Sequence, residues 1–390
     1  MKIDNRKSLI IVGILAATSS LVHFGNANQV RGNPMLDFDS PYYVHLILWM
    51  GGEIDSLPPQ PFRMRITVPA LASLIYRYIG VNNAFGLINS ILWIATVLIY
   101  FYAVRKLYDI KTATVTSVLF SYSVPVMVYG AAISTDMLGY LALAATTLYL
   151  VKSSSQETKS MILLGVLLYF ATMGREVSIL AIAYVFIYRI LTDRKRFYSA
   201  VVEVFYLLVF AVLGLVTASL LIPQPGYTAY FYQALQGSLS VDKVLREAYQ
   251  IIATYHIGWI FICWNLINVR RSEKDRGDVL FLTSLIVGST FLIIDHFIGV
   301  ISSRFVFLTY LGFIIAIYRG MESIRDLLCL KPKLGFCRHI SWMVFTVYVG
   351  VGLIFTAESN LSFPTISDTQ IAQLFPKNYP IEKLWRIKGE

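Results

Sequence analysis

The chain is a succession of long apolar runs separated by short basic segments. A run of about 20 apolar residues crosses the hydrocarbon core of a bilayer, with roughly 17 to 25 as the range. Charged and turn-forming flanks mark eleven such runs, three of which are short and must extend into polar flanks or lie within the bundle. They cover 8–24, 84–104, 112–131, 137–151, 160–173, 177–191, 200–222, 248–268, 279–297, 303–318 and 340–356. The sequence therefore predicts an all-α fold, a polytopic transmembrane helical bundle.

Composition excludes a soluble protein and argues against a nucleic-acid partner. Charged residues are 14% and apolar residues 56% of the chain, whereas an average soluble domain has roughly 25% charged residues. The net charge of +10 comes from clusters between the apolar runs, as membrane topology requires. The three cysteines follow no metal-ligand pattern. The first run lacks a small-x-small cleavage site, so it is interpreted as a signal anchor.

The distribution of basic residues predicts the orientation. Short loops rich in Lys and Arg stay in the cytoplasm, and most of the 33 basic residues fall on the side of the N-terminus. With the N-terminus inside, residues 1–356 form the transmembrane domain, residues 25–83 a large outer loop and residues 357–390 an outer tail. Within the loop, residues 42–50 and 66–79 are too short or interrupted to span, so they are predicted to be interfacial helices.

Once the basic residues have fixed the topology, the acidic and unusual residues fall on the outer side. The first loop carries an acidic pair and an arginine pair, and further charges stand at the ends of other runs. Charges at membrane level are costly and usually mark a functional site, so a reaction centre is predicted at the outer interface. The candidate residues are Asp37, Asp39, Arg63, Arg65, Asp136, Arg175, Glu176 and Arg304, together with Tyr42, Tyr43, His256, Asp295 and His296.

Several of these residues also have a structural interpretation. The two loop aspartates can simply be solvated. Asp136 precedes an apolar run and can cap a helix N-terminus. Arg175 and Glu176 can pair with one another across a turn, and Arg304 can extend to the lipid headgroups. The two outer histidines are expected to be hydrogen-bonded structural residues, because no second His or Cys stands at ligand spacing.

The functional interpretation rests on chemistry that needs both signs of charge. Transfer of a group from a phosphate carrier needs a carboxylate, either as a base or as a ligand for a divalent cation such as Mg or Mn. It also needs cations that stabilise the departing phosphate, and arginine suits this because its planar fork donates two hydrogen bonds. Asp37 and Asp39 supply the carboxylate, and Arg63, Arg65, Arg175 and Arg304 the cations.

Several motifs along the chain together resemble the membrane-embedded GT-C glycosyltransferases. In order they are DFDSPYY, PFRMRITVPALA, STDMLGY, GREVSIL and SRFVFLTYLGF. The resemblance implies a polyprenyl-phosphate sugar donor, inversion at the anomeric carbon and an acceptor that is a lipid, a glycan or a protein. It places the role of base or metal ligand on Asp37 or Asp39, and that of phosphate ligand on Arg304 and Arg63. No WWDYG-type motif is visible, which argues against transfer of a whole glycan to asparagine.

Two other classes of function remain open on the sequence. A transporter or lipid flippase predicts repeated halves or charges near the bilayer midplane, but the charges here stand at helix ends. A membrane acyltransferase, or a glycan polymerase or ligase, is the other class, and His45 and His256 keep the acyltransferase possible. The absence of a retention signal and of long cytosolic extensions favours a prokaryotic plasma membrane.

Overall fold

The computed structural model describes most of the chain, and all its regular structure there is helical. The described residues are 5–30, 39–152, 158–193, 195, 197–222, 240–269, 275–298, 301–309, 311–329 and 337–361. The described part holds four helices long and apolar enough to cross a membrane, or up to six if two bent pairs each count as one span. A polytopic helical bundle is thus confirmed, whereas the number of eleven spans stays a prediction.

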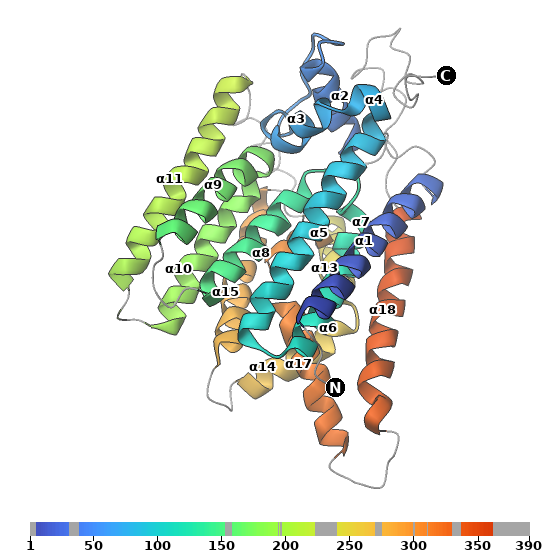
Figure 1. Cartoon of the computed structure of the whole chain (residues 1–390), viewed down its shortest axis with the longest axis vertical. Helices are drawn as coiled ribbons and strands as arrows, with labels where there is room; N and C mark the ends of the chain where they lie inside the picture. The colour runs from blue at the N-terminus through green and yellow to red at the C-terminus, as the bar shows by residue number, and fades with distance from the viewer. Residues whose placement is uncertain are drawn as a thin grey trace.

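The long helices lie side by side in a tilted bundle (Figure 1). The four span-length helices are α1 (Asn5–Val30), α5 (Val81–Leu107), α11 (Phe197–Leu221) and α15 (Arg276–Ile298). Shorter helices complete the bundle, namely α8 (Asp136–Lys152), α9 (Thr158–Gly174), α10 (Leu180–Thr192) and α18 (Cys337–Leu361). Because α18 continues to Leu361, the helix runs past the predicted boundary at 356, and residues 362–390 of the predicted tail lie outside the described residues.

Three of the predicted spans are each divided into two helices. The run 112–131 becomes α6 (Ile110–Ser121) and α7 (Val124–Tyr129), and α7 has a proline in its first turn. The run 248–268 becomes α13 (Val241–Tyr255) and α14 (Gly258–Val269), which meet at 79°. The run 303–318 becomes α16 (Ser303–Thr309) and α17 (Phe313–Cys329). The apolar runs do not reveal such breaks, because no Asp, Glu, Lys or Arg stands at any of the three positions where a run is divided.

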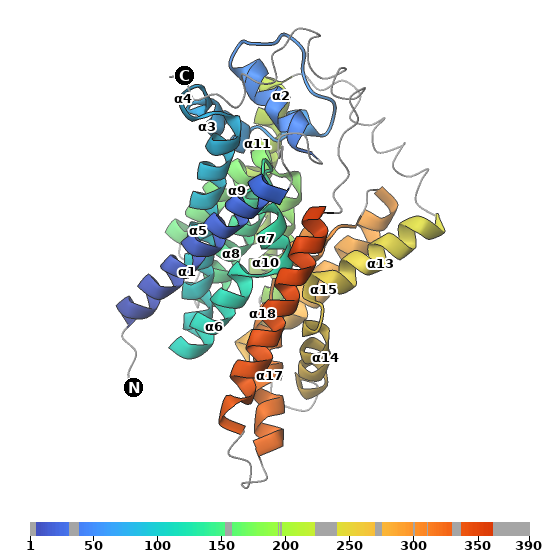
Figure 2. The same cartoon turned by 90° about the vertical axis from the view of Figure 1, so that its right-hand side faces the viewer.

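The first loop forms a compact cap over one end of the bundle (Figures 1 and 2). It contains α2 (Ser40–Met50), the 3-10 turn η2 (Phe62–Met64), α3 (Thr67–Ser73) and α4 (Tyr76–Ile79). Both short helices predicted in this loop are therefore present, the second as two pieces. Tyr43, Leu46, Ile47 and Leu48 on α2 are fully buried. Hence α2 packs into the protein, and its side chains are fixed by neighbouring helices.

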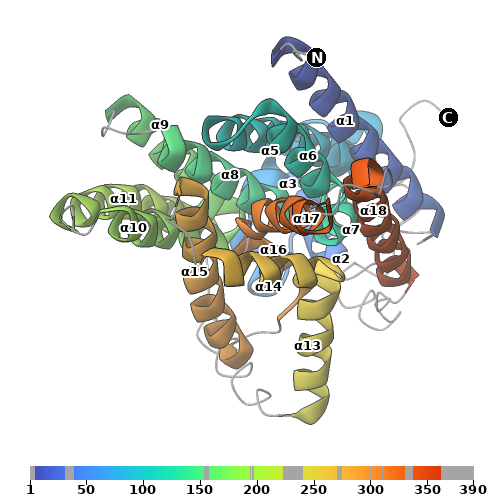
Figure 3. The ribbon, with the colours of Figure 1, turned by 90° about the horizontal axis from the view of Figure 1, so that it is seen from below.

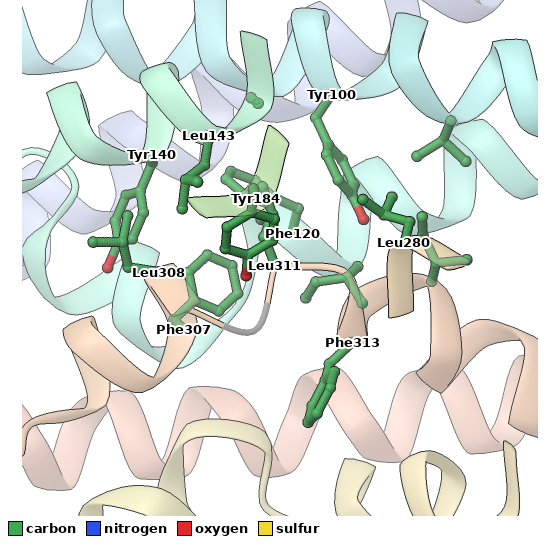
Figure 4. Close-up of a cluster of buried hydrophobic side chains, with 14 of the residues drawn as sticks. Tyr100, Phe120, Tyr140, Leu143, Tyr184, Leu280, Phe307, Leu308, Leu311 and Phe313 are labelled. Carbon is green, nitrogen blue, oxygen red and sulfur yellow. The ribbon is translucent and has the colours of Figure 1, made fainter. Parts of the chain in front are cut away.

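A buried aromatic cluster holds α16 in the centre of the bundle (Figure 4). The ring of Phe307 on α16 lies 5.2 Å from that of Phe120 and 5.3 Å from that of Tyr140, measured between centroids. The Tyr140 hydroxyl donates to the backbone carbonyl of Arg304 at 3.3 Å, and the Tyr184 hydroxyl donates to the carbonyl of Thr309. Both ends of this short helix are therefore tied to α8 and α10, and the backbone of Arg304 is fixed.

Close contact between α9 and α11 depends on a glycine. A Cβ atom on Gly214 would overlap the backbone oxygen of Tyr169 and the hydroxyl of Thr172. By contrast, a Cβ on Gly350 in α18 would have no neighbour within 4 Å. We therefore expect Gly214→Ala to separate these two helices and to lower the free energy of unfolding by about 1–3 kcal/mol.

The matched control is Gly350→Ala, which should leave stability unchanged or slightly raised because alanine is the better helix former. Thermal unfolding of both variants in the same detergent is the measurement. Equal unfolding temperatures for the two variants would contradict this packing.

Candidate functional site

Four charged side chains from distant parts of the sequence meet at the capped end of the bundle. Asp39 immediately precedes α2, and Asp136 is the first residue of α8. Arg175 stands between α9 and the 3-10 turn η3 (Glu176–Ile179), and Arg304 is on α16. Each lies at a helix end, which explains why residues so far apart in sequence converge once the helices pack. We call this set the charged cluster.

The carboxylate of Asp136 bridges the two arginines. Its Oδ1 lies 2.9 Å from Nη2 of Arg175, and its Oδ2 lies 3.3 Å from Nη1 of Arg304. The same Nη1 lies 3.0 Å from Oδ2 of Asp39. The side chains of Asp136 and Arg175 are 5% and 0% exposed, so these are buried ion pairs. Asp136 is thus in the first turn of its helix with both carboxylate oxygens bound to arginines.

Aromatic rings enclose the two guanidinium groups. The Cζ atoms of Arg175 and Arg304 lie 5.2 Å and 5.1 Å from the centroid of the Phe305 ring, and Arg304 is also 5.4 Å from the Tyr129 ring. Cations near ring faces are stabilised electrostatically. Nε and Nη1 of Arg175 have no hydrogen-bond partner among the described residues. Buried N–H donors of this kind normally have a partner, so this arginine can bind an additional acceptor.

A second network supports the charged cluster from the first loop. Arg65 donates through Nε to Glu176 at 3.0 Å, through Nη2 to the other oxygen of Glu176, and through Nη1 to the Tyr43 hydroxyl at 3.0 Å. The Tyr43 hydroxyl also lies 3.3 Å from that of Thr135. Thr135 precedes Asp136 and Glu176 follows Arg175. The network therefore joins the chain neighbours of both members of that ion pair.

Arg65 also keeps Glu176 ionised. Burial raises the pKa of Glu176, but the charge and hydrogen bonds of Arg65 lower it more, to about 2.

The interpretation that Arg175 and Glu176 pair with each other is wrong, because each binds a residue from another segment. All three nitrogen atoms of the Arg65 guanidinium donate within the protein.

The remaining predicted residues lie in other surroundings. Tyr42 stacks on Phe62 with centroids 4.2 Å apart, and the pKa of the Tyr42 phenol is raised by burial and by Asp39. Arg63 donates to the Pro58 carbonyl within its own loop. Asp37 lies outside the described residues.

Residues at the end of α15 and along α13 form a neighbouring group. Asp295 is 7% exposed and its Oδ2 has no partner among the described residues. His296 pairs through Nδ1 with Glu247 at 2.5 Å. His256 has a positive φ of 38° at the break after α13, with its ring stacked on Phe355. His296 is thus hydrogen-bonded as expected, whereas the same expectation is wrong for His256, because neither of its ring nitrogens has a hydrogen-bond partner among the described residues.

Asp39, one of the two predicted metal ligands, has an arginine as its partner in this site. No three His, Cys, Asp or Glu side chains come together as metal ligands in the described part of the chain. The cation that lies between Asp39 and Asp136 is the guanidinium of Arg304. The other predicted metal ligand, Asp37, lies outside the described residues.

Residues that sequence analysis missed are mainly aromatic and hydroxyl side chains. Phe305, Tyr129 and Thr135 all contact members of the charged cluster or its supporting network. Aromatic residues make up 14% of the chain and occur in every apolar run. Their presence beside a charged residue therefore carries no signal that distinguishes a site from the core.

Part of the chain matches the model of a known protein family, and two of the four residues of the charged cluster lie in the matched segment. Residues 63–222 match the model described as dolichyl-phosphate-mannose-protein mannosyltransferase. That segment contains Asp136 and Arg175, whereas Asp39 and Arg304 lie on either side of it. A search of curated proteins finds no match.

Solved structures with the same fold come from an archaeal oligosaccharyltransferase. The Archaeoglobus fulgidus enzyme tethered to an acceptor peptide matches with a TM-score of 0.60 and 13% identity, over 97% of this chain and 59% of that one. Its complex with an inhibitory peptide and a dolichol-phosphate gives 0.58 and 11% over the same shares, 97% and 59%. The complex with Zn and sulfate gives 0.55 and 12%, over 93% and 54%. This chain thus spans little more than half the length of these structures.

These matches, together with the helical bundle and its cap, define the class of fold. The chain has the fold of the GT-C superfamily of integral-membrane glycosyltransferases. The resemblance stated from the sequence motifs is confirmed at this level.

Removing the partner of Arg65 should destabilise the protein strongly. Glu176→Gln leaves a buried guanidinium without its counter-charge, and we expect a loss of roughly 3 kcal/mol in unfolding free energy. Glu322→Gln is the matched control, because Glu322 pairs with the half-exposed Lys111 and with Arg325. An ion pair at the surface contributes about 1 kcal/mol or less.

Thermal unfolding of the two variants in the same detergent is the measurement. A loss for Glu176→Gln no larger than that for Glu322→Gln would contradict the supporting role of this pair.

Proposed function

We propose that the protein is a membrane glycosyltransferase that moves a sugar from a polyprenyl-phosphate donor to an acceptor hydroxyl, with inversion at the anomeric carbon. The observation that carries the proposal is the charged cluster, in which two buried arginines and two carboxylates meet at one end of a GT-C-type bundle. The match to a mannosyltransferase family model supports this class of chemistry. The acceptor is a lipid, a glycan or a protein.

The two arginines are the proposed ligands of the donor phosphate. Arg175 has N–H donors without a partner among the described residues. The guanidinium groups of both arginines lie beside the ring of Phe305. A phosphate oxygen bound there accepts charge-assisted hydrogen bonds in a water-poor environment, where they are strong. The fixed backbone of α16 means that little reorganisation is needed as charge develops on the leaving group.

Asp39 is the better candidate for the base among the described carboxylates. Asp136 binds arginines through both of its oxygens, whereas only one oxygen of Asp39 has a partner among the described residues. The Asp39 side chain is 15% exposed, against 5% for Asp136, and so is more accessible to an acceptor. Asp136 is therefore proposed as a positioning residue that holds both arginines.

The proposed reaction is a direct displacement. Asp39 takes the proton of the acceptor hydroxyl while the hydroxyl oxygen forms a bond to the anomeric carbon of the sugar. The bond from that carbon to the phosphate oxygen breaks, and its electron pair leaves with the phosphate, whose negative charge is stabilised by Arg175 and Arg304.

The proposed site faces the outside of the cell. The end of α5 lies opposite the cap (Figure 1). Tyr108 follows this helix, and the ion pair of Arg319 with Asp278 lies beside the Tyr108 hydroxyl. Basic residues gather at this end, including those in the last turn of α5, and such segments stay in the cytoplasm. We infer an N-terminus in the cytoplasm and a prokaryotic plasma membrane.

The bent helices favour one second candidate, a lipid flippase. Discontinuous helices are typical of transporter binding sites, and α16 with α17 forms such a bent pair. Movement of the donor lipid from one leaflet of the proteoliposome membrane to the other, without formation of a glycosidic bond, would identify this function.

Replacement of the proposed base should abolish transfer and leave donor binding intact. Asp39→Asn keeps an oxygen for Arg304 but cannot take a proton, so kcat is expected to fall by roughly 10²–10⁴. Asp55→Asn is the control, since Asp55 is an exposed aspartate of the same loop. The measurement is sugar transfer from polyprenyl-phosphate donors in proteoliposomes.

Full transfer by Asp39→Asn would contradict this mechanism. A loss that is equal in Asp55→Asn would also contradict it, because the effect would then be a general response of the loop.

A further inference from the structure

The polarity of α13 is reversed relative to a helix on a water-exposed protein surface. Such a helix turns its apolar side to the core and its charged side outward. In α13 the charged side chain of Glu247 is 3% exposed and Thr254 is fully buried. The exposed side carries instead an apolar stripe, which consists of Val241, Val244, Leu245, Tyr249 and Ile252, each between 42% and 73% exposed.

The polar side of α13 binds the segment that leads into α16. Glu247 accepts a hydrogen bond from the backbone N–H of Ile301 at 3.1 Å through one oxygen, and pairs with His296 through the other. Gln250 accepts from the backbone N–H of Ser303 at 3.0 Å. Ser303 is the residue before Arg304. Polar side chains of α13 therefore hold the backbone on which a cation of the charged cluster stands.

The direction of α13 also differs from that of a spanning helix. It meets α14 at 79°, and the change of direction occurs at His256, whose positive φ ends the helix. Figures 2 and 3 show α13 extending away from the bundle, near one end of α15. If α14 runs across the membrane, α13 runs along its surface.

We propose that α13 lies in the membrane interface at the site end, with its apolar stripe among the acyl chains of the bilayer, and that this contact positions Arg304. Lipid is favoured over a second copy of the chain because the same kind of surface continues on α15, where Ile293 and Ile294 are 63% and 49% exposed. An amphipathic helix whose apolar face is buried at the level of the headgroups is a common membrane contact. The positioning part rests on the proposed function, whereas the membrane contact does not.

Fluorescence depth measurements test the membrane contact directly. Cys263, Cys329 and Cys337 are first replaced by serine, and single cysteines are introduced as Leu245→Cys or Ile252→Cys and labelled with an environment-sensitive fluorophore in proteoliposomes. We expect blue-shifted emission and quenching by lipids that carry a quencher on the acyl chain. Arg246→Cys, at an exposed position off the apolar stripe, is the matched control and should show neither effect.

Emission from the stripe that matches the Arg246→Cys control would overturn the membrane contact. So would blue-shifted emission without quenching by the lipids, because the stripe would then be covered by protein.

The positioning part has a separate test in the transfer assay. Gln250→Leu removes the acceptor for the Ser303 N–H, and we expect kcat to fall about tenfold because Arg304 is then held less precisely against the leaving phosphate; a tenfold loss corresponds to about 1.4 kcal/mol of transition-state stabilisation. Gln250→Glu retains an acceptor oxygen and should restore most of the rate. Equal rates for the wild type and Gln250→Leu, or no rescue by Gln250→Glu, would overturn the positioning role of α13.

Wild-type protein without any transfer activity would contradict the proposed function and leave the fluorescence result intact.

Discussion

The carboxylate of Asp136 between Arg175 and Arg304 is the interaction on which the site depends. The carboxylate of Asp39, paired with Arg304, supplies the second negative charge, and buried ions are stable only if their charges compensate one another in this way. The position of Asp136 in the first turn of α8 adds to this, since the N-terminal end of a helix favours negative charge. Because the three residues come from three different helical segments, their contacts can form only when α8, α9 and α16 pack at one end of the bundle.

The surroundings of this cluster make it rigid. Arg65 joins the chain neighbours of Asp136 and Arg175 through Glu176, Tyr43 and Thr135. Tyrosines from α8 and α10 hold both ends of α16. Preorganised charges of this kind stabilise a developing negative charge without rearranging during the reaction. The cap of short helices thus serves the site as well as covering the bundle.

Much of this architecture follows from the sequence because the bilayer imposes simple rules. Apolar runs predicted the helical bundle, and the residues GREV, STDM and SRF were recognised as candidates because charge next to an apolar run is costly. Which charged side chains form ion pairs with one another was harder to predict. Arg175 binds Asp136 and not the adjacent Glu176, and only the packing of α8 against α9 decides this. The break after α13 is also not predictable from the sequence, since a histidine carries no signal for the positive φ that His256 adopts.

The central claim is that one composite site binds the phosphate of a lipid carrier. It is tested most directly by an experimental structure of the protein with a polyprenyl phosphate bound. The account predicts phosphate oxygens within hydrogen-bond distance of Arg175 and Arg304, about 3 Å, and Asp39 on the side where the sugar carbon would lie. A phosphate bound elsewhere, with the ion pairs of Asp136 undisturbed and out of contact, would contradict it.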